Sequence, residues 1–159
     1  MEKLLQLLQE NARYTDEQLA VMLGKSKEEV AAEIAKYEKQ GIIKGYKAIY
    51  DWDKINTSYV VAFIELKVTP KRDLGFDEVA KTIAQYEEVE SVYLMSGGYD
   101  LSVTVAGKSF KDIALFVSQR LATLDSVVST ATHFVLSRYK EKNVILFGQE
   151  KDERSFTIL

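Results

Sequence analysis

Residues 15–40 read TDEQLAVMLGKSKEEVAAEIAKYEKQ, and they contain two helix-start signals on either side of one glycine. Thr15 and Ser26 are each followed, three residues later, by Gln or Glu. That spacing fits a capping box, in which the hydroxyl accepts from an amide of the first turn and the later side chain reaches back to the cap. Gly24 stands where the first helix should end. Two short helices joined by a tight glycine turn are typical of a helix-turn-helix, whose second helix enters the major groove of double-stranded DNA.

Apolar residues around these signals recur with helical spacing. Leucines near the start of the chain predict one more helix, so we expect a three-helix unit that ends near Gln40, with Gly41 as its C-terminal stop. Residues 42–50 read as an extended segment similar to the wing or exit strand of a winged helix. The predicted apolar stripes are Leu4, Leu5 and Leu8; Leu19, Ala20 and Leu23; and Val30, Ile34 and Tyr37.

From Tyr59 onward the pattern changes to strands that alternate with helices. The order β-α-β-β-α-β predicts a ferredoxin-like sandwich, in which four antiparallel strands carry two helices on one face. The fold class is therefore α+β. The predicted strands are 60–68, 89–95, 101–105 and 128–137, and the predicted helices are 76–84 and 110–121. The expected organisation is a helix-turn-helix domain over 1–50, a linker over 51–58, a ferredoxin-like domain over 59–142 and a tail over 143–159.

The second face of the predicted sheet is not clearly polar. Val61 and Phe63 alternate with the inward residues of the first strand, and Phe134 and Leu136 are assigned to the same second face. An apolar second face favours a partner, most simply a second copy of the domain. The apolar residues 144–147 in the tail are expected to add an edge strand or to reach a neighbouring chain.

The overall composition is that of a globular protein, and it excludes several classes of site. The 159 residues are 47% hydrophobic and 28% charged, with no apolar run near the ~20 residues of a membrane span and no signal-peptide pattern. No cysteine is present, which excludes disulfides, thiolate metal sites and a thiol nucleophile. We therefore expect a cytoplasmic protein that is not bound to a membrane.

The net charge of −3 is unusual for a protein expected to bind DNA. Residues 1–50 hold eight Lys/Arg and eight Asp/Glu, so this half is neutral rather than basic. Any affinity for DNA must therefore come from the local placement of lysines.

Five residues of the second capped helix and its approach are the candidate DNA contacts. Those at the start of the helix should meet base edges or phosphates, and those further along should meet phosphates. The alternative is a solvated face in which Glu28 or Glu29 pairs with lysines at helical spacing. The candidates are Lys25, Ser26, Lys27, Lys36 and Lys39.

A glycine-rich turn before the third strand is the candidate small-molecule site. Its glycines permit the close approach of a ligand, Asp100 can take an ammonium group, and free amides can take a carboxylate. Two threonines spaced by two in the last strand point to one face and can add hydroxyl contacts. The alternative is a hairpin that needs glycines for its own geometry. The candidates are Ser96, Gly97, Gly98, Tyr99, Asp100, Thr130 and Thr132.

No other residue pattern predicts catalysis, a metal or a cofactor. His133 is the only histidine, and residues 51–53 supply two carboxylates, too few for calcium. The sequence holds no phosphate-binding loop and no supported nucleophile arrangement. We therefore expect no enzyme activity, no metal and no cofactor.

Four motifs in this order resemble the Lrp/AsnC family, also called feast/famine regulators. The resemblance runs from about residue 3 to about residue 140, and it implies a transcription regulator that dimerises through its C-terminal sheets and often assembles into octamers. It also implies that a small amino acid binds between subunits. The motifs are LLQLLQENAR at 4–13, GIIKGYKA at 41–48, GGYDL at 97–101 and TATHFVL at 130–136.

The second capped helix departs from the family pattern. Glu33 stands where relatives commonly carry arginine, and residues 26–40 hold four acids, three lysines and no arginine. Arginine makes the best bidentate contact to guanine, so direct readout by this helix is in question. Two alternatives follow: a metabolite-sensing oligomer with weak or no DNA binding, and a small enzyme on a ferredoxin-like sheet.

Overall fold

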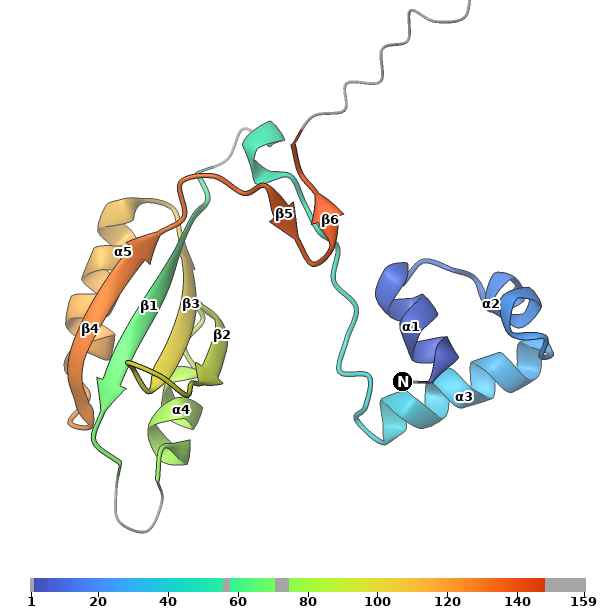
Figure 1. The fold of residues 1–159 in the computed structure, drawn as a ribbon, viewed down its shortest axis with the longest axis horizontal. Coiled ribbons are helices and arrows are strands. Elements are labelled where there is room, and N and C mark those ends of the chain that lie inside the picture. Colours follow the sequence, from blue (N-terminus) through green and yellow to red (C-terminus); the bar gives the residue numbers. More distant parts are fainter. Residues whose placement is uncertain (1, 56–57, 71–74, 148–159) are drawn as a thin grey trace, which may run out of the picture. The chain divides into compact units, whose positions relative to one another are not determined.

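The computed structural model describes residues 2–55, 58–70 and 75–147, and the chain divides into two compact units, Met1–Ala48 and Ile49–Leu159 (Figure 1). No helix among the described residues is long and apolar enough to cross a bilayer.

The first unit contains three helices around a small core. The core consists of Leu4, Leu19, Ala20, Val30 and Tyr37, which come from all three predicted stripes. The helices are α1 (Lys3–Glu10), α2 (Asp16–Leu23) and α3 (Lys27–Lys39).

Both predicted capping boxes are present, and each sets the start of a helix. Thr15 Oγ1 accepts from the Gln18 amide at 3.2 Å, while the Thr15 amide donates to Gln18 Oε1 at 2.9 Å. Ser26 makes the same reciprocal pair with its third neighbour, Glu29, at 3.2 and 2.8 Å. Between the two helices Gly24 has φ +65°, a left-handed conformation that costs a residue with a Cβ about 1–2 kcal/mol.

The segment after α3 continues without a paired strand. The amides of Ile42 and Ile43 donate to the Tyr37 carbonyl at 2.9 and 3.2 Å, which closes the last turn of α3. Residues 44–50 pair with no strand in the part of the chain that the structure describes. The expected wing is thus an extended connection, since a wing strand needs a second strand for its hydrogen bonds.

The second unit is a four-stranded antiparallel sheet in the order β2-β3-β1-β4, which is the predicted ferredoxin-like topology (Figure 1). Helix residues and strand residues share one core, so both helices cover the same face of the sheet. The strands are β1 (Val60–Val68), β2 (Val89–Leu94), β3 (Leu101–Gly107) and β4 (Val127–Phe134), and the helices are α4 (Asp77–Ile83) and α5 (Phe110–Phe116), the latter followed by a π-helical turn, η2 (Val117–Leu121). The core consists of Ala62, Ile64, Leu66, Val68, Val79, Ile83, Leu101, Val103, Val105, Ile113, Phe116, Val117 and Leu121.

The opposite side of the sheet, which we call the open face, carries exposed aromatic side chains. Directly opposed residues of antiparallel strands point to the same side, so register identifies this face. One row crosses the sheet through Phe63 and His133, and the next crosses it through Tyr93 and Ala131. Phe63 is 49% exposed and Tyr93 is 54% exposed. The register therefore confirms that Val61 and Phe63 of β1 point to this second face, but Glu65 and Lys67 share it, so the face is only partly apolar.

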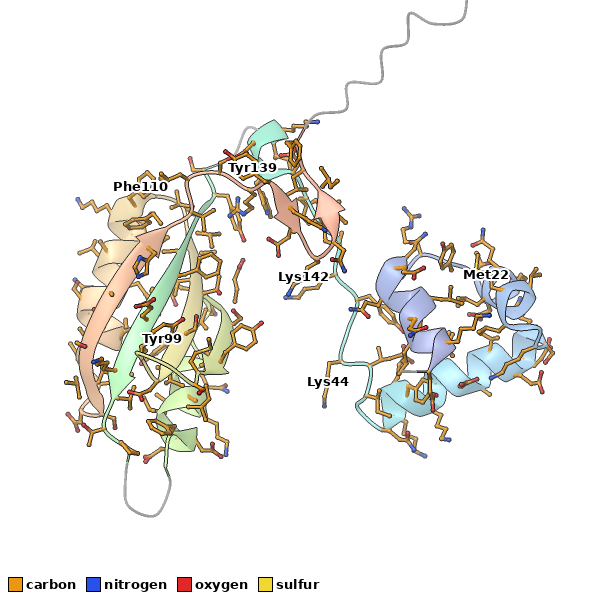
Figure 2. All side chains as sticks on the ribbon, viewed as in Figure 1. Met22, Lys44, Tyr99, Phe110, Tyr139 and Lys142 are labelled. Carbon is orange, nitrogen blue, oxygen red and sulfur yellow. The ribbon has the colours of Figure 1, made fainter. Side chains whose placement is uncertain are left out.

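The prediction was wrong for Phe134. This residue pairs with Ala62 in the register of β4 against β1, and it therefore points to the helix-covered side. There its ring packs edge-to-face on Phe110 of α5, with centroids 4.8 Å apart (Figure 2 labels Phe110). Leu136 lies beyond the end of β4 and is 89% exposed. Alternation within one strand cannot say which side is covered, because that depends on the register with β1.

The apolar residues of the tail do not add an edge strand to the main sheet. They form a separate hairpin, in which β5 (Lys140–Glu141) pairs with β6 (Val144–Ile145). The two turn residues, Lys142 and Asn143, have φ of 45° and 70°, as expected for a tight hairpin turn (Figure 2 labels Lys142). Residues 148–159 of the predicted tail lie outside the described residues.

Candidate functional site

The outward face of α3 is the first candidate surface. Val30 and Tyr37 turn inward to the core, so the opposite side of the helix faces away from the unit. That side is exposed, and Lys36 and Lys39 form no ion pair with any residue that the structure describes. The outward residues are Glu28, Ala32, Ala35, Lys36 and Lys39.

The two lysines nearest the start of α3 are each paired with a carboxylate. Lys25 Nζ lies 2.5 Å from Glu33 Oε2, and Lys27 Nζ lies 2.5 Å from Glu17 Oε1. The partners are thus Glu33 and Glu17 rather than the nearer acids that helical spacing suggested. Hydrogen bonds to these carboxylates raise the pKa of Lys25 and of Lys27. Hydrogen bonds lower the pKa of Glu17 to about 2, with Lys27 as the largest cause and with smaller contributions from the backbone and Thr15, so both members of this pair are charged at neutral pH.

Ser26, a candidate DNA contact, is also the cap of α3. Its hydroxyl accepts from the Glu29 amide, and its own amide donates to Glu29 Oε2. The hydrogen bonds from Ser26 lower the pKa of the Glu29 carboxyl, with the backbone contact as the larger cause. A negative carboxylate therefore lies at the positive end of the helix, beside the surface that would meet DNA phosphates.

The turn between β2 and β3 is the second candidate surface, and Asp100 holds it to β1. Asp100 Oδ2 accepts from the Val68 amide at 2.8 Å, and the Asp100 amide donates to the Leu66 carbonyl at 2.9 Å. The Asp100 carbonyl also accepts from the Met95 amide at 2.8 Å, which closes the turn around Gly97 and Gly98. The sequence did not suggest this structural role, because Val68 and Asp100 are 32 residues apart.

The two oxygens of this carboxylate differ in their surroundings. Asp100 Oδ1 accepts no hydrogen bond from the residues that the structure describes. Asp100 and Tyr99 are half-buried, while Ser96, Gly97 and Gly98 are exposed (Figure 2 labels Tyr99). A fixed, partly exposed carboxylate beside an exposed glycine turn can accept from an ammonium group.

The two threonines of β4 point to the helix-covered side of the sheet. Thr130 opposes Leu66 and Thr132 opposes Ile64, both of which are core residues, and both threonines are half-buried. Thr130 lies at the same end of β1 as Asp100, but on the other flank of that strand, so ~10 Å separates the backbones. The structure therefore brings Thr130 to the same sheet end as the turn, and Thr132 one row further in.

His133 lies on the open face rather than in either candidate site. Its Nε2 is 3.6 Å from Glu65 Oε1, and its side chain is more than half exposed. The described residues contain no group of three or more His, Asp or Glu side chains that could hold a metal ion.

An aromatic cluster packs the segment before β1 against the rest of the second unit. Trp52, in the short 3-10 helix η1 (Trp52–Lys54), stacks on Tyr59 with ring centroids 4.0 Å apart. The Arg138 guanidinium lies over the Tyr59 ring, 5.3 Å from its centroid. The Tyr59 hydroxyl donates to Glu90 Oε1. Burial, with this hydrogen bond, raises the pKa of Tyr59 to about 12.

Comparisons with known proteins match both units. The second unit matches the Lrp/AsnC ligand binding domain over residues 61–145, and the first matches a winged helix-turn-helix DNA-binding domain over residues 2–44. A Bacillus subtilis (strain 168) protein described as the uncharacterized HTH-type transcriptional regulator YugG is 50% identical over 153 residues, covering 96% of this chain and 92% of the relative. A proline dehydrogenase transcriptional activator from Rhodobacter capsulatus is 26% identical over 133 residues, covering 84% of this chain and 86% of the activator.

A solved structure supports the fold. The transcriptional regulator NMB0573 from Neisseria meningitidis, in complex with L-Met, has a TM-score of 0.70 at 24% identity, covering 89% of this chain and 93% of that chain. At that identity the likeness concerns the fold alone. With the two domain matches and the relative at 50% identity, the assignment is direct: the chain belongs to the Lrp/AsnC family of helix-turn-helix transcriptional regulators.

Proposed function

We propose that this regulator binds double-stranded DNA through α3, and that a small amino acid held at the β2–β3 turn changes its DNA contacts or its assembly. The observation that carries the first part is the pair of capped helices around Gly24, which presents an exposed, lysine-bearing face of α3. Binding chromosomal DNA places this activity in the cytoplasm. The proposed regulation involves no catalysis and needs no cofactor besides the amino acid.

The proposed DNA contacts divide into two groups. Lys36 and Lys39 are unpaired with described residues, so they are available to phosphates without any rearrangement. Lys25 and Lys27 must first exchange a carboxylate for a phosphate, and Ser26 must keep its capping contact. Two such helices in a dimer would lie about one DNA turn apart and would match a pseudo-palindromic site.

The proposed effector is a free amino acid. Asp100 Oδ1 would accept from its ammonium group, and amides of residues 96–99 would donate to its carboxylate. The hydroxyls of Thr130 and Thr132 would complete the site across β1. Two similar proteins, a proline dehydrogenase transcriptional activator and a regulator in complex with L-Met, support an amino-acid-related role.

We propose that the open face joins two copies into a dimer and that dimers assemble further, for example into an octamer. The exposed rings of Phe63 and Tyr93 on this face support burial against a second copy. An amino acid bound between subunits could then shift one assembly state against another, by the difference in its affinity for the two states.

A second candidate function is a metabolite-sensing oligomer with weak or no DNA binding. The ion pairs of Lys25 and Lys27 favour this second function, because their positive charges are already neutralised by Glu33 and Glu17 and attract DNA phosphates less. Salt dependence separates the two candidates, since a DNA binder loses affinity steeply as salt rises.

The test is DNA binding of the purified protein to its own upstream DNA at two salt concentrations, with and without a mixture of the twenty amino acids. Salt-sensitive binding that exceeds binding to random DNA would establish the DNA-binding activity, and a change with amino acids would establish the effector. No binding at low salt would leave the sensor as the function of this chain.

A further inference from the structure

Both cations at the start of α3 already have an anionic partner within the same unit. Lys25 follows Gly24 in the turn, and Lys27 is the first residue of α3, so both stand where an HTH helix approaches DNA. Each ammonium lies 2.5 Å from a carboxylate oxygen, and the acids come from different places: Glu17 from the first turn of α2, and Glu33 from the middle of α3.

The two ion pairs differ in how firmly they are held. Glu33 also accepts from the hydroxyl of Tyr37 at 3.1 Å, and the Tyr37 ring is buried in the core with 6% exposure. The side chains of Lys25 and Glu33 are 41% and 24% exposed, whereas those of Lys27 and Glu17 are 53% and 60% exposed. The first pair is therefore less exposed and is anchored by a buried residue, while the second pair is more exposed and Glu17 has further hydrogen bonds only with Thr15 and the backbone of its own exposed turn.

A carboxylate on a lysine competes with a DNA phosphate for the same ammonium. Each lysine that neutralises a phosphate steepens the dependence of log K on log salt by about 0.9, whereas a lysine that stays on its carboxylate adds nothing to that slope. An unmatched carboxylate left beside the phosphates would in addition repel them.

We infer that Glu17 and Glu33 are intramolecular stand-ins for DNA phosphates that lower the affinity of α3 for the DNA backbone, with Glu33 the stronger of the two. This inference rests on the proposed DNA binding by α3. Its consequence is selectivity: backbone affinity, which all sequences share, is reduced, so that contacts to bases decide where the protein remains bound.

The experiment compares Glu33→Gln and Glu17→Gln with the parent protein on its own upstream DNA and on random DNA, over a series of salt concentrations. Glutamine keeps the size and the acceptor oxygen but removes the charge. We expect Glu33→Gln to tighten binding to random DNA about tenfold at 0.1 M salt and to steepen the salt slope by about 0.9. We expect Glu17→Gln to tighten binding to random DNA by about two- to fivefold, because an exposed ion pair contributes less free energy.

The matched control is Glu38→Gln, which makes the same change of charge near the other end of α3. Glu38 accepts from the Tyr46 hydroxyl at 3.0 Å and pairs with no lysine among the described residues. Its effect on the salt slope should be close to zero. Lys25→Gln combined with Glu33→Gln completes a double-mutant cycle, and the gain from Glu33→Gln should disappear in that background.

Each outcome decides a different point. If the parent protein binds DNA and Glu33→Gln leaves affinity and slope unchanged, or if the gain persists without Lys25, the inference is overturned while the proposed function stands. If the parent does not bind but Glu33→Gln does, the masking is complete and the inference holds. If no variant binds at low salt, the proposed DNA binding fails and the inference falls with it.

Discussion

Among the single residues, Asp100 combines a structural contact with a proposed ligand contact, one on each carboxylate oxygen. Oδ2 accepts from the Val68 amide and holds the β2–β3 turn on β1, whereas Oδ1 accepts no hydrogen bond from the described residues and is the proposed ligand contact. An alanine at this position therefore removes the proposed ligand contact and a structural hydrogen bond together. Loss of response in such a variant would not by itself identify a ligand residue.

Asp100→Asn separates the structural hydrogen bond from the proposed ligand contact. The amide oxygen can still accept from Val68, while the negative charge for an ammonium group is gone. We expect Asp100→Ala to lower the free energy of unfolding of the second unit by about 1.5–3 kcal/mol, as for a hydrogen bond to a charged group, and Asp100→Asn to cost less than half of that. Both should abolish the effect of amino acids on DNA binding. Urea unfolding and the DNA-binding assay measure the two quantities; an intact amino-acid response in Asp100→Asn would remove this residue from the site.

Tyr59 gives the second unit a pH dependence in the alkaline range. Its pKa is raised from 10.0 to about 12 by burial and by the hydrogen bond to Glu90. Because the folded state holds this proton more tightly than the unfolded state, the stabilisation is present below pH 10.0 and is lost as the pH rises to about 12. Tyr59→Phe should lose that part of the pH dependence. The test is to measure the urea unfolding midpoints of the parent protein and of Tyr59→Phe across this pH range. Midpoints that change in parallel with pH would contradict the prediction.

At the scale of elements, α3 depends on Ser26 both for its start and for its proposed DNA contact. The capping box satisfies two donors at the helix start, and losing a cap typically costs about 1 kcal/mol. Function and stability are therefore linked at this one position. A change in DNA binding after Ser26→Ala must be compared with a variant that keeps the cap.

We expect Ser26→Ala to lower the stability of the first unit by about 1 kcal/mol, and Ser26→Asp, which can still cap, to lower it by a few tenths at most. Thermal unfolding followed by circular dichroism measures this. For DNA, Ser26→Asp should bind more weakly than Ser26→Ala, because it adds a negative charge where phosphates are met. Equal stability of all three proteins would show that the cap contributes nothing in solution.

At the scale of the whole molecule, the open face is the surface that most needs a partner. Phe63 lies in the middle of β1 and is 49% exposed, in the same row as His133 and next to the row that contains Tyr93. Aromatic rings in the centre of a sheet face are typical of the core of an interface rather than of a solvated surface. The proposed dimer would bury them.

Phe63→Glu is expected to dissociate this dimer. A carboxylate buried without a partner costs on the order of 3 kcal/mol, which is about a hundredfold in the dimer dissociation constant. Sedimentation velocity would then show a smaller species than for the parent. Leu115→Glu is the control, since Leu115 is also exposed (42%) but lies on α5, which covers the other face of the sheet. An unchanged mass for Phe63→Glu would place the interface elsewhere.

Local patterns in the sequence are enough to predict the helix starts, the strand topology and the family. Capping boxes, alternation and short motifs act over a few residues, so they can be read without knowing the fold, and both boxes and all four main strands lie where they were expected. The partners of the charged groups, and the side of the sheet to which β4 residues point, depend on the tertiary fold. Lys25 meets Glu33 and Asp100 meets Val68 because folding brings together residues 8 and 32 positions apart. Phe134 faces the helices because register against β1, rather than alternation within β4, assigns a side chain to one face.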